Sequence, residues 1–341
     1  MNAAAANELR GFMRKLVLKL MLGVVVLWGV GCAATKTAPQ LVPPAPPKPP
    51  ENPWSWLPES STVLGRVAID ELRKTALWPL WSEIEGEQKL ASWVDLPKVS
   101  RVTFGGTGQS REDMSYVAVL EGAFGETELS LLAQRDQVSA EQRGLLTVYH
   151  KPEGYWTQLT PRLIVMCTPD RIDALVLRAS QGDGTLIKEG ALYKSLAERV
   201  QLEGAHVVVL ADELAGEGRE RLEQRASRYG LGSLTREAAR VGVSIEVGSE
   251  YRLVALAETA DEQKANALSG DVKQKLDEVA SNFFVRMLGI GALLSKVRVS
   301  NDSRYVFVRG NVPEVDFNEV IKRVHSALSL ANGAGSLGEL P

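Results

Sequence analysis

The chain is poor in the residues that most often carry catalysis or metal binding. Its 341 residues include three histidines and two cysteines. The histidines, at positions 150, 206 and 325, show no HxxxH, HxH or HExxH spacing that would indicate a zinc site. We therefore interpret His150, His206 and His325 as surface or boundary residues, and we predict no metal and no cofactor.

Motifs for phosphate, calcium or nucleophilic chemistry are also missing. The segment FGGTGQS, residues 104–110, lies between two strand-like runs, so it offers no helix N-terminus to a phosphate. The segment QGDGTLIKEG, residues 181–190, lacks the spaced acids and the final glutamate of a calcium loop. GLGSLT, residues 230–235, lacks the last glycine of a nucleophile elbow. The sequence predicts no catalytic residue, and we expect a protein that is not an enzyme.

The charge balance is mildly acidic. The formal net charge is −3, and it becomes −6 without residues 1–31, which contain four Lys or Arg and one Glu. A body of this charge gives no reason to expect nucleic acid or an anionic membrane surface as its partner.

The N-terminus has three regions. Arg10, Arg14, Lys15 and Lys19 are followed by the twelve-residue apolar run LMLGVVVLWGVG, residues 20–31, and then by Cys32. This run is shorter than the roughly 20 residues of a spanning helix and suits a secretory signal. Residues 1–34 resemble a bacterial lipoprotein signal peptide, which implies cleavage after residue 31 and lipidation of Cys32, palmitate included. Ala33 resembles the signal for export to the outer membrane. An ordinary signal peptide or an uncleaved anchor, with Cys32 incidental, is the alternative.

Lipidation of Cys32 would leave Cys167 as the remaining thiol, which cannot form an intramolecular disulfide. We interpret Cys167 as a buried core residue.

Proline dominates residues 39–58, with nine prolines in twenty residues. This composition predicts an extended spacer of about 60 Å between the lipid and the body; a ligand for an SH3-like groove is the alternative. We assign residues 32–58 to the lipidated cysteine and linker.

Two parts of the remaining chain show the same order of patterns. Asp-Glu-Leu occurs at 70–72 and at 212–214, and strand-like runs that begin at Val99 and Val241 keep the same offset of 142. Proline followed by an acid ends a strand-like run at Pro169-Asp170 and again at Pro313-Glu314. The sequence thus predicts an internal duplication of a β-α-β-β-α-β-β-α unit.

The predicted fold class is α+β, with two similar lobes at residues 59–203 and 204–332 and a flexible tail at 333–341. Each lobe is expected to be a mainly antiparallel sheet with helices packed on one face. The stretch PESSTVLGRVAIDELRKTALWPLW, residues 58–81, resembles uncharacterised envelope lipoproteins of Gram-negative bacteria. That resemblance implies no activity and no functional residues.

Tryptophan is concentrated where the linker meets the body. Trp54, Trp56, Trp78, Trp81 and Trp93 are five of the seven tryptophans and fall within forty residues. Packing in a core would explain Trp78 and Trp81, with Trp54 and Trp56 folded back over the same helix. Our functional hypothesis is that Trp54, Trp56, Trp78 and Trp81 form a surface that contacts a partner.

These features favour a non-enzymatic lipoprotein held in the outer membrane by its N-terminal lipid. We expect its body in the periplasm or displayed at the cell surface. There it would act as a scaffold or interaction module with an envelope protein as partner. The alternative is a carrier for a lipid or another apolar ligand between sheet and helices; no small-molecule ligand can be named from the sequence.

Overall fold

The computed structural model describes residues 52–76, 78, 93–108, 115–152, 154–181, 191–197, 199–200, 205–212 and 236–333. The predicted signal peptide, Cys32 and most of the linker lie outside these residues. Within them, no helix has the length and apolar character needed to cross a membrane.

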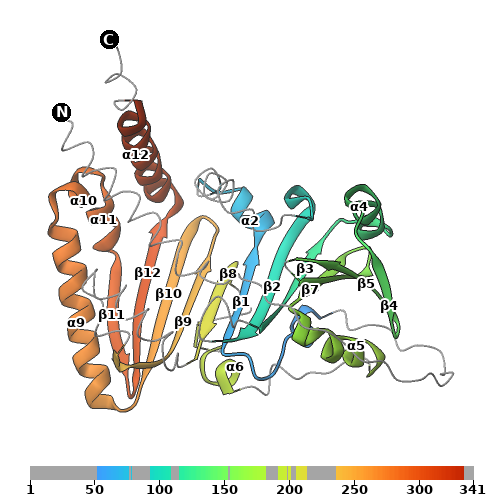
Figure 1. Cartoon of the computed structure of the whole chain (residues 1–341). Coiled ribbons are helices and arrows are strands. Elements are labelled where there is room, and N and C mark those ends of the chain that lie inside the picture. Colours follow the sequence, from blue (N-terminus) through green and yellow to red (C-terminus); the bar gives the residue numbers. More distant parts are fainter. Residues whose placement is uncertain are drawn as a thin grey trace, which may run out of the picture.

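Twelve strands form one antiparallel sheet in the order β11-β12-β10-β9-β8-β1-β2-β3-β7-β6-β5-β4 (Figure 1). In the first half of the sheet, the strands are β1 (Val63–Ala68), β2 (Val99–Thr107), β3 (Ser115–Gly122), β4 (Ala140–Arg143), β5 (Leu146–Lys151), β6 (Gly154–Thr160) and β7 (Leu163–Cys167). In the second half, they are β8 (Val207–Ala211), β9 (Ala238–Glu246), β10 (Glu250–Thr259), β11 (Val297–Asp302) and β12 (Tyr305–Pro313). The predicted α+β class with an antiparallel sheet is confirmed.

The expectation of a separate sheet in each lobe is wrong. β1 pairs with β8 in antiparallel register from Val63 opposite Ala211 to Val67 opposite Val207. A strand at the edge of a separate sheet would leave a row of backbone N–H and C=O groups unpaired, and the β1–β8 pairing satisfies those groups in both halves. The boundary that we predicted at residue 203 therefore divides the sequence but not the sheet.

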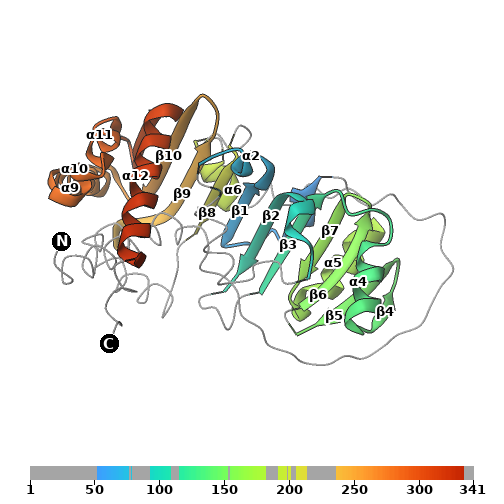
Figure 2. The same cartoon turned by 90° about the horizontal axis from the view of Figure 1, so that it is seen from above.

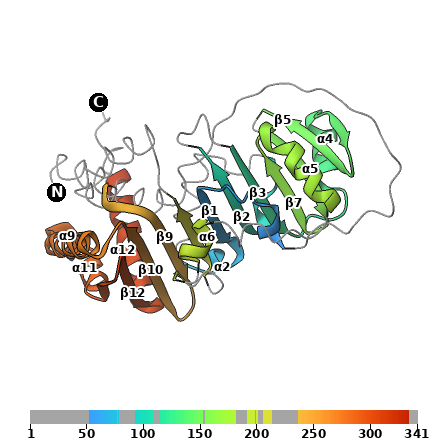
Figure 3. The same ribbon diagram turned by 90° about the horizontal axis from the view of Figure 1, so that it is seen from below.

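Helices cover the sheet on two faces (Figures 2 and 3). One face, which we call the η1 face, packs against η1 (Pro53–Trp56), α5 (Ile172–Gln181) and α6 (Ala191–Leu196). The opposite face, the α9 face, packs against α2 (Ile69–Arg73), α4 (Glu128–Asp136) and α9 (Glu262–Ser281). The remaining elements are η2 (Leu96–Lys98), η3 (Pro169–Arg171), α10 (Phe283–Met287), α11 (Ile290–Leu294) and α12 (Glu314–Gly333). Helices on a single face, as predicted, are thus contradicted in the first half of the sheet.

The helices that directly follow the final strand of each half, α5 and α12, lie on different faces. Ile172, Leu175 and Ala179 of α5 join the core of the η1 face. In α12, Phe317 instead stacks on Tyr251 of β10, with ring centroids 4.3 Å apart. Since side chains alternate along a strand, Tyr251 points to the same side as Ala257, which packs with α9. α12 therefore covers the α9 face.

The structure caps α9 at Asp261, whose carboxylate accepts a hydrogen bond from the Lys264 amide at 2.8 Å. Both proline-acid junctions lead into helices, as predicted. Pro169 opens the turn that leads into α5, and α12 begins at Glu314 directly after Pro313. Asp70 lies within the first turn of α2 and pairs with Arg73, whereas the capping residue is Ala68. The first half also contains β4 and β6, two strands more than the predicted unit.

Candidate functional site

The linker ends inside the folded body. We predicted an extended spacer to residue 58, but Pro53–Trp56 form the short helix η1. Asn52 makes this turn favourable, because its side chain accepts a hydrogen bond from the Trp54 amide at 3.1 Å. Proline at the first helical position costs nothing, since the N–H that it lacks would be unpaired there anyway.

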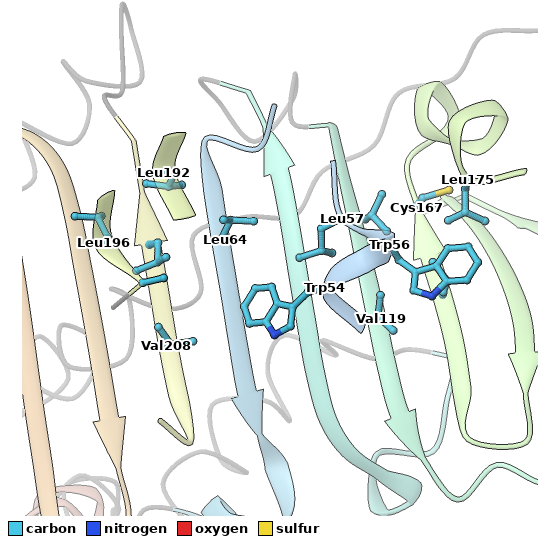
Figure 4. Packing of buried hydrophobic residues seen from close by; sticks show 14 of the residues in the cluster. Trp54, Trp56, Leu57, Leu64, Val119, Cys167, Leu175, Leu192, Leu196 and Val208 are labelled. Carbon is cyan, nitrogen blue, oxygen red and sulfur yellow. The ribbon is translucent and has the colours of Figure 1, made fainter. Parts of the chain in front are cut away.

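Three side chains of this segment fill the space between the η1 face and its helices (Figure 4). Trp54 is 7% exposed, Trp56 2% and Leu57 0%. Trp54 makes an edge-on contact with Tyr193 of α6, with ring centroids 6.0 Å apart. Around them lie apolar residues of β1, β3, β7, β8, α5 and α6, including Leu64, Val119, Cys167, Leu175, Leu192, Leu196 and Val208. This part of the core is packed with the chain's own side chains.

Arg178 of α5 fixes the backbone of the same segment. Its Nη1 donates to the carbonyl of Ser55 at 2.6 Å and to that of Leu57 at 2.8 Å. Burial lowers the pKa of the Arg178 guanidinium, and the carboxylate of Glu59 opposes that shift. Two carbonyls that η1 leaves unpaired thereby obtain a charged donor. We call Trp54, Trp56, Leu57 and Arg178 the linker dock.

A glycine in β2 gives the dock its room. A Cβ on Gly105 would lie 2.8 Å from Oγ of Ser61, 2.9 Å from Cδ2 of Leu64 and 3.3 Å from Cβ of Leu57. The segment can therefore lie directly on the strand. No local pattern points to Arg178 or Gly105, because the Arg178 contacts span 121 and 123 residues of sequence.

The structure does not bring the four predicted tryptophans together as a surface. Trp54 and Trp56 are buried in the dock on the η1 face, so they do not fold back over the α2 segment. Trp78 is half-buried, near α2, and the guanidinium of Arg73 lies 5.4 Å from the centre of its ring. Trp81 and Cys32 lie outside the described residues.

A charged network lies on the η1 face of the second half, and we did not anticipate it. Glu258 of β10 has a side chain that is 4% exposed, and it pairs with Arg304 at 2.8 Å and with Arg240 at 3.3 Å. Arg240 also pairs with Asp212 at 2.9 Å. Burial opposes the charge of Arg240, but the two carboxylates raise its pKa overall. With these four charges paired, the network can fix β8, β9 and β10 together.

The remaining groups considered in the sequence are the three histidines and Cys167. Nδ1 of His206 accepts the Val247 amide at 2.8 Å, which joins the segment before β8 to the end of β9. His150 is exposed and its ring lies 4.9 Å from that of Tyr155. The side chain of His325 lies outside what the structure describes. Burial raises the pKa of the Cys167 thiol to about 12, so that it is neutral at physiological pH. Among the described residues, no three His, Cys, Asp or Glu side chains are grouped as metal ligands.

Comparisons with known proteins give little guidance. No protein-family model matches the chain, and a search of curated proteins found no match. Crystal form I of TP0453 aligns with a TM-score of 0.48 at 11% identity, over 80% of this chain and 97% of that one. Crystal form IV of TP0453 gives 0.46 at 10% identity, over 79% and 96%. At this level of similarity, family and function have to be argued from the residues of this chain.

Proposed function

We propose that this protein is a non-enzymatic lipoprotein of the outer membrane, anchored through Cys32, whose body in the periplasm serves as a scaffold for an envelope protein. The signal-like N-terminus, the proline-rich spacer and the linker dock support the proposal together. The first two come from the sequence alone, and the third is the observation that carries it.

The dock matters because a tether orients a body only if it ends at a fixed point of the fold. Trp54, Trp56 and Leu57 lie in the core, and Arg178 holds two carbonyls of the same segment. The spacer thus joins the body at the middle of the sheet, over β2 and β3, and not at a loose end. A body attached in this way presents a defined surface, which is what a scaffold requires.

We also infer that the two halves of the sheet derive from one duplicated unit. From the central pair outward, the strand orders β1-β2-β3-β7-β6 and β8-β9-β10-β12-β11 correspond position by position. In both halves, a helix on the α9 face, α4 or α9, follows the third of these strands. This order supports duplication, with α5 and α12 as the main divergence.

A carrier would need room for an apolar ligand between sheet and helices. Under α5 and α6, that space contains the buried side chains of Trp54, Trp56, Leu57 and Leu196. We therefore place the carrier second. The carrier would be favoured over the scaffold if lipid copurified with the protein in a fixed ratio and was lost in the Leu196→Trp variant.

Anchoring is tested by Cys32→Ser, with Cys167→Ser as the matched control. We expect Cys32→Ser to leave the outer-membrane fraction and Cys167→Ser to stay in it. If both variants fractionate with the membrane, the lipid anchor is excluded.

The scaffold role is tested by photocrosslinking in cells from position 74, an exposed lysine at the end of α2 near Trp78. A discrete protein adduct, identified by mass spectrometry, would support the proposal. Lipid adducts alone would favour the carrier.

A further inference from the structure

Basic side chains lie over two aromatic rings on the η1 face of β12. The guanidinium carbon of Arg309 lies 4.0 Å from the ring centre of Phe307, and that of Arg199 lies 3.9 Å from the ring centre of Tyr305. Phe307 and Tyr305 are 5% and 8% exposed, whereas both arginines are exposed. The rings support the guanidinium groups and leave their N–H donors accessible to a partner.

A third arginine joins them from the neighbouring strand. Arg298 of β11 lies directly opposite Arg309 of β12, so the two side chains share the η1 face. Its neighbours Val297 and Val299 alternate to the other face, where Val299 packs with the residues under α9. We call Arg199, Arg298 and Arg309 the arginine surface.

These three arginines differ from the other basic residues of the region. Arg240, Arg252 and Arg304 each form an ion pair within the chain. In the part of the chain that the structure describes, no carboxylate lies within ion-pair distance of Arg199, Arg298 or Arg309, and Arg309 donates to Oγ of Ser300 at 3.3 Å. Like charges directly opposite each other on adjacent strands are unfavourable, and an anion between them would remove that penalty.

We propose that the arginine surface is the docking site for an acidic segment of the partner protein. This inference rests on the proposed scaffold function and gives its partner a chemistry. Arginine stacked on an aromatic ring is a common centre of protein interfaces, because the rigid guanidinium binds carboxylates through two parallel hydrogen bonds.

The surroundings favour a protein over an anionic membrane. Asp302 lies on the same face of β11 as Arg298, and the Glu246–Arg252 pair lies on the same face of β9 and β10. The chain as a whole has a net charge of −3. A uniformly negative bilayer would be repelled by these carboxylates, whereas a protein surface can offer charges of both signs in matching positions.

The first test measures binding of fluorescent poly-L-glutamate to the full chain in detergent. We expect the double variant Arg298→Glu/Arg309→Glu to weaken binding about tenfold or more. The matched control is Arg162→Glu/Arg286→Glu, which changes the net charge equally at two exposed arginines outside the surface. The neutral double variant Arg298→Gln/Arg309→Gln should weaken binding less. It takes the place of Arg298→Glu/Arg309→Glu if the glutamate variant does not fold.

Equal weakening by the test and control pairs would show only general electrostatics and would overturn the proposal. Binding that depends on Arg298 and Arg309 for phosphatidylglycerol vesicles or inorganic phosphate, but not for poly-L-glutamate, would assign the surface to anionic lipid or phosphate instead.

The second test places the photocrosslinker at Ser300, which lies between Arg298 and Asp302 on β11. A protein adduct that disappears in Arg298→Glu/Arg309→Glu supports the docking site. An adduct from position 74 without one from Ser300 leaves the scaffold intact and refutes the arginine surface. No protein adduct from either position refutes the scaffold as well.

Discussion

The two halves of the sheet carry different side chains on the η1 face. In the first half, Leu64, Val119 and Val165 are buried beneath η1 and α5. In the second half, from β9 to β11, the same face has more polar residues beside the buried Leu256, Tyr305 and Phe307. They are Arg240, Ser244, Glu246, Arg252, Glu258, Arg298, Ser300 and Arg309. Among the described helices, α5 lies over this face, whereas α12 lies over the other. The face is most apolar where the described elements η1, α5 and α6 pack on it.

We expect the largest change in stability from a substitution in the first half of the sheet, beneath η1 and α5. We expect Trp56→Ala to lower the free energy of unfolding by about 3–5 kcal/mol, because it leaves a cavity in the dock. Phe283→Ala is the control, since Phe283 is 71% exposed and its loss should change stability by less than about 0.5 kcal/mol. Urea unfolding measures both. Similar values for the two variants would mean that the dock is not part of the core.

The polar half should depend on its ion pairs. Glu258→Gln keeps the shape of the side chain but removes the charge shared by Arg240 and Arg304, and we expect a loss of about 2 kcal/mol. Glu246→Gln breaks a pair in which both side chains are exposed, so its effect should stay below about 0.5 kcal/mol. A negligible effect of Glu258→Gln in urea unfolding would argue that the network adds no stability.

In the first half of the sheet, the hydrogen bonds from Arg178 to the backbone should contribute less to the free energy of unfolding than the packing of Trp56. Arg178→Met keeps most of the apolar stem but leaves the carbonyls of Ser55 and Leu57 without their donor, and we expect a loss of about 1–2 kcal/mol. Cleavage by chymotrypsin near Trp54 and Trp56 should become faster. Arg309→Met, in the second half, should leave both the stability and the cleavage rate unchanged.

The smallest effect concerns a single thiol under α5. Because burial raises the pKa of Cys167 to about 12, its thiol is almost entirely neutral at pH 8. In the Cys32→Ser chain, we expect iodoacetamide to modify Cys167 very slowly in the native protein and rapidly in urea. Modification at the same rate in both conditions would indicate that α5 opens readily.

Local features of this fold were predictable from the sequence. The cap at Asp261, the apolar spacing of α12 and the starts of α5 and α12 after proline all depend on neighbouring residues. β6 was missed although it carries the buried Trp156, because Gly154 at its start is a residue typical of turns. In the structure Gly154 begins the strand with a φ of +145°.

Features that depend on distant residues were not predictable. Nothing near β1 or β8 specifies that the two strands pair, since each would accept any free edge of matching register. The same holds for the dock, which unites residues 53–57 with Arg178, and for the choice of face by α12. The duplication itself remains a proposal, because the pattern that suggested it does not determine how two copies join.

The linker dock also determines how the molecule responds to mechanical load. A pull on the N-terminal side of Asn52 reaches η1 first, and η1 is held by buried side chains and two bonds from Arg178. β1, the next element, is hydrogen-bonded along both edges, to β2 and to β8. Residues 53–62 should therefore peel away before the sheet yields, adding about 30 Å of length. Under tension, the dock would act as a reversible extension of the spacer that spares the twelve-stranded sheet.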